Sequence, residues 1–321
     1  MSSTENILEA ARVWIHDKGR STSGLRIVTD TSNFWQVDVN SVVVLEPGAY
    51  LVYGHEKEGR FGLDDQDKFW VKKAIDLATG QRKILKLDYS ERFRIKIGSR
   101  VFDCYRSAQK EARLLELTRG LHHFMQGISA SDAVGNNVRI VDFIPGPTFS
   151  ALIDDLNLPH EEYFHRVMPH MLDLFRPCVA AVAYLHEKGE KHGDVRRDHL
   201  IYGPDNLLSW IDFDYNYQHG EYIAGLDMFG LGNILAFIVG GGDQTLRILL
   251  ETNPESVDKL TPDDMNIVFP NRVMNLKLIF PHIPDSLNNI LKHFTAHAHV
   301  FYDSVRELLA DLDYARSELG K

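Results

Sequence analysis

The first half of the chain is dominated by segments whose apolar residues alternate or run together, a pattern typical of β-strands. Residues 34–53 are rich in β-branched and aromatic residues and predict a pair of strands around a turn at Pro47. Residues 68–74 and 82–87 predict two further antiparallel strands. Residues 138–144 predict one more strand, and the Pro-Gly-Pro that follows marks a domain boundary.

Other segments repeat their apolar residues at the spacing of an α-helix. Residues 5–15 form one such segment, and residues 110–120 form another, in which strong helix formers end at a glycine. Residues 160–189 predict one or two helices that are interrupted near their two internal prolines. Residues 304–316 begin with a capping box and carry an apolar stripe, which predicts a helix that buries one face.

Two acidic residues flank a short predicted hairpin in the middle of the chain. Its strands are residues 199–202 and 207–211, separated by a turn of glycine, proline, aspartate and asparagine. Asp194 precedes the hairpin and Asp212 follows it, so we expect the hairpin to bring the two carboxylates close together. Such a pair suits phosphoryl transfer, in which one carboxylate accepts the proton of an attacking hydroxyl and the other holds a metal ion on the phosphates.

Composition and charge narrow the classes of protein. Of the 321 residues, 44% are hydrophobic and 25% charged, which is typical of a globular enzyme long enough for two domains. The formal charge of -10 and the pI near 5.8 disfavour a surface for nucleic acid or anionic membranes, because such surfaces need clustered Lys and Arg. We interpret the local basic residues as a solvated face: Arg92, Arg94, Lys96 and Arg100.

Cysteine usage and hydropathy favour a cytoplasmic protein. Cys104 and Cys178 are the only cysteines and have no CxxC spacing, so neither a disulfide framework nor a structural zinc site is predicted. The first residues are acidic where a signal peptide would be basic, and no apolar run approaches the ~18 residues of a membrane span. We therefore expect a soluble, cytoplasmic protein with no nucleic-acid or membrane partner.

The residues around the two acids resemble the active-site motifs of the protein kinase superfamily. HGD at residues 192–194 is similar to the start of HRDxxxxN, and DFD at residues 212–214 is similar to DFG. By this resemblance Asp194 is the catalytic base and Asp212 is a metal ligand. The resemblance covers about residues 50–318, with the landmarks in the order of the family.

The resemblance implies an α+β, two-lobed protein kinase-like fold that binds ATP in the cleft together with Mg²⁺ or Mn²⁺. Residues 1–45 would be an N-terminal extension of unknown role, and residues 46–144 a small β-rich lobe with one helix. Residues 145–321 would form the larger, mainly helical lobe, and residues 283–316 within it look like the last helices of bacterial serine/threonine kinases.

A lysine and a glutamate of the first domain resemble the ion pair of kinases. Lys86 lies in a strand similar to VAIK, and Glu111 lies in a helix similar to the αC helix, ExxLLxxL. The resemblance implies that Lys86 binds the nucleotide phosphates and pairs with Glu111. By periodicity alone, Lys83 is an equal candidate, and Glu116 would form a surface pair instead.

Four further residues are expected to bind ATP. Gly59 and Gly62 match the glycine-rich loop GxGxFG, although a plain hairpin turn explains these residues equally well. The segment with Asp142 and Ile144 takes the place of the hinge, which in kinases hydrogen-bonds adenine through its backbone.

The predicted catalytic loop departs from the family at several positions. Gly193 replaces the arginine of HRD, as in kinases of small molecules such as aminoglycosides and choline. His199 replaces the asparagine that holds the second metal ion, and it either ligates a metal or packs structurally. Arg196 takes the place of the residue that contacts the transferred phosphate. Asp227 is expected to anchor the backbone of the loop.

Three functions are consistent with these residues. The first is an ATP-dependent serine/threonine protein kinase-like enzyme, which transfers the γ-phosphate of ATP to a hydroxyl. The second is a small-molecule kinase, favoured by HGD and by a short activation segment. The third is a nucleotide-binding pseudokinase or scaffold. It is favoured by Lys57 in place of the first glycine of the glycine-rich loop, by Asp64 in place of the apolar residue expected after the last glycine, and by His199. We favour the first, with a protein hydroxyl as the acceptor.

Overall fold

The fold is α+β, and a computed structural model describes residues 3–60, 63–98, 100–218, 225–298 and 300–319. The residue contacts divide the chain into two units. Unit 1 consists of Met1–Glu91, Arg106–Leu121 and Met125–Ile144. Unit 2 consists of Arg92–Tyr105, His122–Phe124 and Pro145–Lys321. The last division falls where the sequence placed its boundary, whereas the segment Arg92–Tyr105 was expected in the first domain.

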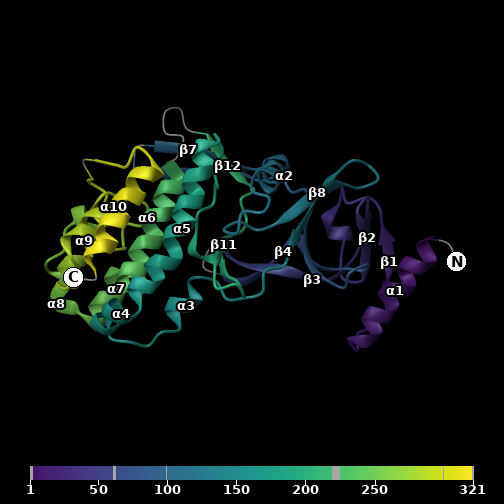
Figure 1. Ribbon diagram of the computed structural model, residues 1–321, viewed down its shortest axis with the longest axis horizontal. Helices are drawn as coiled ribbons and strands as arrows, with labels where there is room; N and C mark the ends of the chain where they lie inside the picture. Colours follow the sequence, from purple (N-terminus) through teal and green to yellow (C-terminus); the bar gives the residue numbers. More distant parts are fainter. Residues whose placement is uncertain (1–2, 61–62, 99, 219–224, 299, 320–321) are drawn as a thin grey trace. The chain divides into compact units, whose positions relative to one another are not determined.

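Unit 1 is built on a mixed sheet with the strand order β1-β2-β3-β4-β5-β9-β8 (Figure 1). The strands are β1 (Arg26–Val28), β2 (Ser41–Leu45), β3 (Gly48–Arg60), β4 (Leu63–Asp76), β5 (Arg82–Lys86), β8 (Gly127–Ser131) and β9 (Asn137–Asp142). β1 pairs with β2 in parallel, and the other neighbours are antiparallel. The strands expected from the apolar alternation are therefore confirmed, except that Phe34–Gln36, the start of the expected pair, form a 3₁₀ turn.

The N-terminal segment belongs to this sheet and is not a separate extension. Helix α1 (Ser3–Asp17) buries Ala11 and Ile15 against Val42 and Leu51 on one face. The opposite face carries the main core of the unit, made of residues such as Val43, Val52, Leu85 and Ile140. Neighbouring residues of one strand thus belong to two separate cores, because successive side chains of a strand point to opposite faces.

Helix α2 (Ala108–Leu117) packs against β8 and β9 within unit 1. Its first turn is fixed by Ser107, whose side chain accepts a hydrogen bond from the backbone N–H of Lys110 at 3.1 Å. The same turn carries Glu111, which is fully buried. The N-cap therefore sets the position of an acidic residue inside unit 1.

Unit 2 is mainly helical. Its helices are α3 (Ala151–Asp154), α4 (His160–Arg166), α5 (Met168–Glu187), α6 (Gly225–Gly240), α7 (Leu246–Thr252), α8 (Pro254–Val257), α9 (Asp285–Lys292) and α10 (Val305–Glu318). Helix α6 is apolar on all sides and packs against α5 and α9, as expected of a buried helix. Helix α5 runs through Pro177, so the expected interruption there is wrong: burial of Phe175, Cys178 and Val179 outweighs the local penalty of proline.

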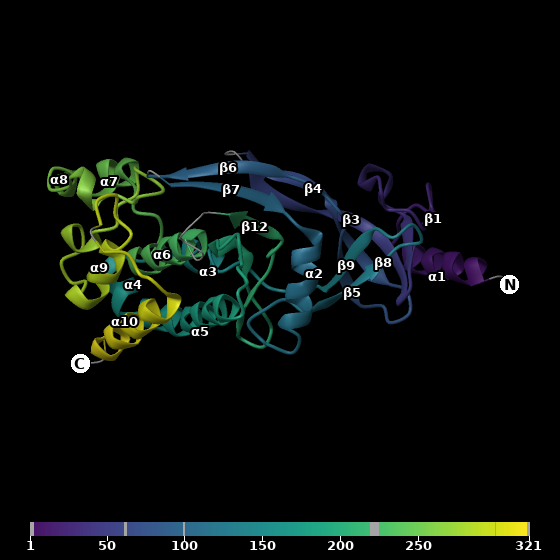
Figure 2. The same ribbon diagram turned by 90° about the horizontal axis from the view of Figure 1, so that it is seen from above.

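Residues 92–106 form a hairpin that the sequence analysis missed. Strands β6 (Arg92–Ile97) and β7 (Arg100–Arg106) join β12 (Tyr215–Gln218) in the order β12-β7-β6 (Figure 2). Arg92, Arg94 and Lys96 are exposed as expected, but the alternating residues Ile95 and Ile97 are partly or fully buried. The basic patch is therefore one face of an amphipathic strand.

The predicted hairpin between the two acids is confirmed as β10 (Leu200–Tyr202) and β11 (Leu208–Trp210). Short 3₁₀ turns lie at Phe34–Gln36, Arg197–His199, Pro262–Asp264 and Leu276–Leu278. Within the described ranges, no helix has the length and apolarity that crossing a bilayer requires.

The packing of His160 makes the stability of unit 2 depend on pH. Its ring stacks on Phe280, with Nε2 donating to the carbonyl of Val239 at 3.0 Å and Nδ1 facing His282 at 2.9 Å. Burial lowers the pKa of His160 from 6.5 to about 4. Below pH 6.5 the imidazole of His160 is protonated in the unfolded chain but stays neutral in the folded protein. The stability of the folded state therefore falls as the pH falls towards 4.

Between pH 6.5 and 4 we expect His160 to lower the free energy of unfolding by at most about 3 kcal/mol. The decrease should be smaller than this limit because the ring is partly exposed. In His160→Phe, urea unfolding should show a flatter pH dependence over this interval than in the wild type. The exposed His170 provides the matched control, since His170→Gln should leave the wild-type pH profile intact. Equal profiles for wild type and His160→Phe would show that this ring contributes nothing.

Candidate functional site

Unit 1 holds a buried cluster of two cations around one carboxylate. The Nζ of Lys86 lies 2.5 Å from Oε1 of Glu111, and the Nε of Arg139 lies 3.1 Å from Oε2. All three side chains are at most 2% exposed. Lys86 and Arg139 are direct neighbours on the paired strands β5 and β9, so both reach the same residue of α2. The Lys86–Glu111 pair was predicted, and Arg139 was missed.

The alternatives for this pair have partners elsewhere. Lys83 lies 2.5 Å from the carboxylate of Asp142, and Glu116 pairs with Arg119 on the exposed side of α2. The ambiguity between Lys83 and Lys86 is thereby resolved in favour of Lys86 as the buried cation.

The other residues expected to bind ATP receive less support. The backbone N–H of Asp142 donates to Gln126 at 2.8 Å, so it is already used within unit 1. Ile144 follows β9 and is half-buried, and its contact with adenine stays a prediction. Gly59 lies in the irregular end of β3, and Gly62 lies outside the described residues. The glycine-rich loop therefore also stays a prediction.

In unit 2, Asp227 of α6 anchors the loop that carries Asp194. Its carboxylate accepts hydrogen bonds from the backbone N–H groups of His192 and Gly193, both at 2.8 Å, and from Nε2 of His186 at 2.9 Å. Burial opposes ionisation, but these donors hold the pKa of Asp227 below its usual value. The predicted anchoring contact is confirmed. Gly193 itself has φ +91°, a conformation that favours glycine.

Asp194 and Asp212 lie on two sides of one histidine. The Nδ1 of His199 is 2.9 Å from the backbone oxygen of Asp194 and 3.5 Å from its Oδ2. The Nε2 of the same ring is 3.8 Å from Oδ2 of Asp212. His199 is 4% exposed, and both carboxylates remain partly accessible. The prediction that the hairpin brings these acids near each other is confirmed, and the structure adds that His199 lies between them.

The hydrogen bond to the backbone fixes the tautomer of His199. A carbonyl oxygen can only accept, so Nδ1 carries the proton and donates it to Asp194. In the neutral ring, Nε2 therefore presents a lone pair towards the carboxylate of Asp212. Two electron donors 3.8 Å apart are suited to a shared cation, which is the arrangement of a histidine and a carboxylate that ligate one metal ion.

The backbone and the electrostatics around these acids are also unusual. Asp212 has φ +58°, in the left-handed region that non-glycine residues rarely occupy and that often marks functional sites. Burial raises the pKa of Asp194, while His199 and Arg196 act against this shift. A carboxylate whose pKa is raised accepts a proton more readily, which suits a general base.

Among the residues that the structure describes, no three His, Cys, Asp or Glu side chains form a ready metal cage. Mg²⁺ in phosphoryl-transfer sites is commonly held by one or two carboxylates together with substrate phosphates and water. The carboxylate of Asp212 and the Nε2 of His199, 3.8 Å apart, are two ligand atoms that could belong to such a partial site.

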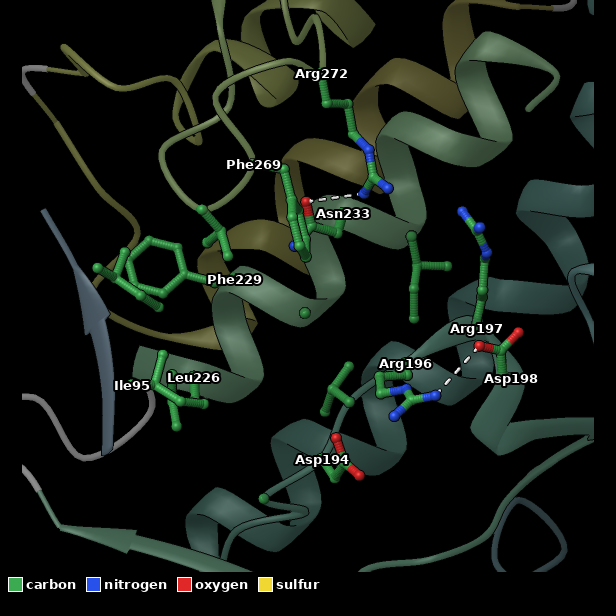
Figure 3. A pocket seen from close by; sticks show the side chains of 16 residues that line it. Ile95, Asp194, Arg196, Arg197, Asp198, Leu226, Phe229, Asn233, Phe269 and Arg272 are labelled. Atoms are coloured by element: carbon green, nitrogen blue, oxygen red, sulfur yellow. Dashed lines mark hydrogen bonds and ion pairs between the residues drawn. The ribbon is translucent and has the colours of Figure 1, made fainter. Parts of the chain in front are cut away.

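A cavity of about 400 Å³ opens beside Asp194 (Figure 3). The loop contributes Asp194 and Arg196, and helix α6 contributes much of the wall. The remaining lining comes from the β6 strand and from the segment before α9. The apolar residues of the whole cavity are Ile95, Ile97, Val195, Leu226, Phe229, Ile234, Val268 and Phe269. The missed hairpin therefore supplies one wall of this cavity.

Three arginines line the cavity, and two of them share one carboxylate. Arg196 lies 3.5 Å from Asp198, and 39% of its side chain is exposed, so it remains accessible to an anion. Arg197 pairs with Asp243 at 2.8 Å. Arg272 lies 3.0 Å from the same Asp243.

Gly230 of α6 sets how closely the Asp194 loop approaches that helix. A Cβ atom at this position would lie 2.4 Å from the backbone oxygen of Val195, next to Asp194. We expect Gly230→Ala to push the loop away and to lower about 10²-fold any reaction in which Asp194 takes part, because small misplacements of reacting groups have effects of this size. Steady-state kinetics would measure it. Gly48→Ala is the control, as this glycine has no positive φ and its Cβ would make only an ordinary contact, 3.6 Å from Oη of Tyr50; equal losses in both variants would contradict the role of Gly230.

Sequence reasoning missed several residues of these sites. Arg139 carries a partial signal, since a charged residue interrupts the apolar strand 138–144. Ile95 and Ile97 carry the clear alternation of a strand, which the neighbouring arginines obscured. Asn233 and Arg272 are far apart in the chain and belong to no motif, so only the fold reveals them.

No model of a known protein family matches this sequence, and no curated protein is significantly similar to it.

Proposed function

We propose that this protein is an ATP-dependent phosphotransferase of the protein kinase-like fold, which transfers the γ-phosphate of ATP to a hydroxyl. The observation that carries the proposal is the arrangement of Asp194, His199 and Asp212 within unit 2. It combines a carboxylate suited to accept a proton with a histidine and a second carboxylate that face each other across 3.8 Å.

Each unit supplies a different part of the machinery. In unit 1, Lys86 would bind the phosphates of ATP, and Glu111 would orient it, as the buried pair at 2.5 Å supports. In unit 2, Asp194 would accept the proton of the attacking hydroxyl, while Arg196 would stabilise the charge on the transferred phosphoryl group.

Asp212 and His199 would hold a divalent metal ion, Mg²⁺ or Mn²⁺. When bound, such an ion neutralises the charge on the phosphate oxygens of the nucleotide. The imidazole ligand favours Mn²⁺ more than an all-oxygen site would, because Mg²⁺ prefers hard oxygen ligands. Asp227 acts at a distance by fixing the backbone on which Asp194 is carried.

The nature of the cavity favours a small molecule over a protein as the acceptor. Its 400 Å³ lies within the range of small-molecule sites, roughly 300–1,000 Å³, and it is walled by apolar side chains next to the proposed base. The serine/threonine protein kinase expected from the C-terminal helices remains the second candidate, and transfer to protein hydroxyls would identify it.

Thermal unfolding with ATP tests the proposal. The wild type, Lys86→Met and Asp212→Asn are compared with ATP alone and with ATP plus Mg²⁺ or Mn²⁺. ATP at about 100 times its Kd should stabilise the wild type by about 2.7 kcal/mol, and the metal-dependent part should disappear in Asp212→Asn. Lys83→Met is the matched control for Lys86→Met, since Lys83 pairs with the exposed end of β9. A wild type that no nucleotide stabilises would refute the proposal.

A further inference from the structure

The two ends of the cavity differ in chemistry. In Figure 3, Asp194 lies at one end, and Asn233 and Arg272 lie at the opposite end. Between them, Leu226 and Phe229 project from the same side as Ile95 of β6. A ligand that fills the cavity therefore meets a proton acceptor, then an apolar wall, then a group of hydrogen-bond donors.

The far end offers donors that the protein does not use. The Oδ1 of Asn233 accepts from Nδ2 of Asn266 at 2.7 Å and from Nη1 of Arg272 at 3.4 Å, which orients the amide. The NH₂ group of Asn233 is consequently left for another partner. Within the described ranges, the Nε of Arg272 is buried without a hydrogen-bond partner. A buried donor without a partner is unfavourable, so the guanidinium of Arg272 keeps hydrogen-bonding capacity that its present contacts do not use.

The acidic partners at this end are divided unequally between the two arginines. Arg197 and Arg272 share the carboxylate of Asp243 at 2.8 and 3.0 Å. Arg197 is further stabilised by Asp198 and Asp154, whereas Arg272 is stabilised by Asp243 and repelled by Arg197. Burial is the main reason that the pKa of Arg272 is lowered, and Arg197 adds to the shift. A second anion beside Arg272 would oppose the repulsion from Arg197.

We infer that the acceptor is a small alcohol with an apolar body and a carboxylate, its hydroxyl at Asp194 and its carboxylate at Arg272 and Asn233. The planar guanidinium matches the geometry of a carboxylate, and its stacking on Phe269, 4.7 Å from the ring centre, keeps it in place. This inference rests on the proposed function, because it names the molecule that receives the phosphoryl group.

The reaction that follows is balanced without a further reactant. The oxygen of the alcohol forms a bond to the γ-phosphorus of ATP, and the bond from that phosphorus to the β,γ-bridging oxygen breaks. ADP leaves with the electron pair of the broken bond. The proton of the alcohol passes to the carboxylate of Asp194.

Matched pairs of probes test the inference. One pair is 4-(hydroxymethyl)benzoate and its amide, and the other is 6-hydroxyhexanoate and its amide, which differ in length and stiffness. Thermal unfolding measures binding of each probe without ATP, and a coupled assay measures ADP formation with ATP and Mg²⁺. The proteins are the wild type, Arg272→Gln, Arg272→Lys, Asp194→Asn and the control Arg247→Gln, whose arginine is exposed on α7 and outside the cavity lining.

At least one carboxylate should have a KM about tenfold or more below that of its amide in the wild type, as a charge-assisted hydrogen bond allows. In Arg272→Gln this preference should fall to about twofold or less, with an intermediate value in Arg272→Lys. Arg247→Gln should keep the wild-type preference. Asp194→Asn should still bind the carboxylate probe while losing transfer.

Several results would overturn the inference while leaving the proposed function intact. They are equal binding of carboxylate and amide in the wild type, no binding of any probe by a protein that binds ATP, and transfer to protein hydroxyls alone. If ATP itself does not bind, the proposed function fails. Binding of the carboxylate probes, and its loss in Arg272→Gln, then decides the ligand class of the cavity separately.

Discussion

Asp212→Asn should lower phosphoryl transfer about 10³-fold, equivalent to about 4 kcal/mol of transition-state stabilisation, while the protein stays folded. The substitution removes the negative charge that would hold the metal ion and keeps the size of the side chain. Asparagine adopts the left-handed region more readily than most residues, so the φ of +58° at this position is preserved. The loss should therefore reflect chemistry and not misfolding.

Two measurements distinguish a loss of chemistry from misfolding. Urea unfolding of Asp212→Asn should agree with that of the wild type to within about 1 kcal/mol, as expected of an isosteric change at a side chain that is 17% exposed. Asp205→Asn, a matched change in the exposed turn of the β10–β11 hairpin, should leave kcat unchanged. Wild-type kcat in Asp212→Asn would exclude this carboxylate as a metal ligand.

Glu111→Gln should destabilise unit 1 by about 3–5 kcal/mol, the usual effect of removing one member of a buried ionic cluster. The neutral amide would leave Lys86 and Arg139, each 2% exposed, beside a group that no longer carries the compensating charge. Urea denaturation followed by the fluorescence of the unit 1 tryptophans measures the effect. Binding of ATP should weaken as well, because Lys86 would lose the group that orients it.

Two further variants define the cause. Glu116→Gln changes the same residue type on the exposed side of the same helix, and it should cost less than about 1 kcal/mol. The triple change Lys86→Met, Glu111→Leu and Arg139→Leu should recover most of the stability, because apolar residues of similar volume often replace a buried ionic cluster. A loss of stability below about 1 kcal/mol in Glu111→Gln would mean that the cluster does not depend on the charge of Glu111.

The sequence predicted the elements whose signals are local. Alternation in residues 82–87 identified a strand, and the spacing of residues 110–120 identified a helix with Glu111 in it. Choosing Lys86 over Lys83 was beyond local information. These two lysines differ by an odd number of positions and so point to opposite faces, and only the fold shows which face α2 covers.

The hairpin at residues 92–106 shows how charge can conceal a pattern. Arg92, Arg94 and Lys96 attract attention as a basic patch, while Ile95 and Ile97 between them carry the signal of a half-buried strand. Even with the strands recognised, their pairing with β12, more than a hundred residues later, depends on tertiary contacts.

The candidate site divides in the same way. Asp194, His199 and Asp212 lie within one short stretch, where a hairpin with a readable turn brings them together. Asn233, Asp243 and Arg272 converge from separate segments of unit 2 and carry no motif, so the far end of the cavity was invisible in the sequence. The residues that a local hairpin brings together were predictable, and the residues at the far end of the cavity were not.

The most direct test of the central claim is the conversion of ATP itself, followed by ³¹P NMR. Wild type and the double variant Asp194→Asn/Asp212→Asn are incubated with ATP and Mg²⁺, using a deproteinised cell extract as the source of acceptors. The wild type should convert the γ-phosphate resonance of ATP into that of a phosphate monoester, at a rate at least 10³-fold above the double variant, about 4 kcal/mol. ATP that stays intact with the wild type, or equal rates for the two proteins, would contradict the claim that these carboxylates form a phosphotransferase site.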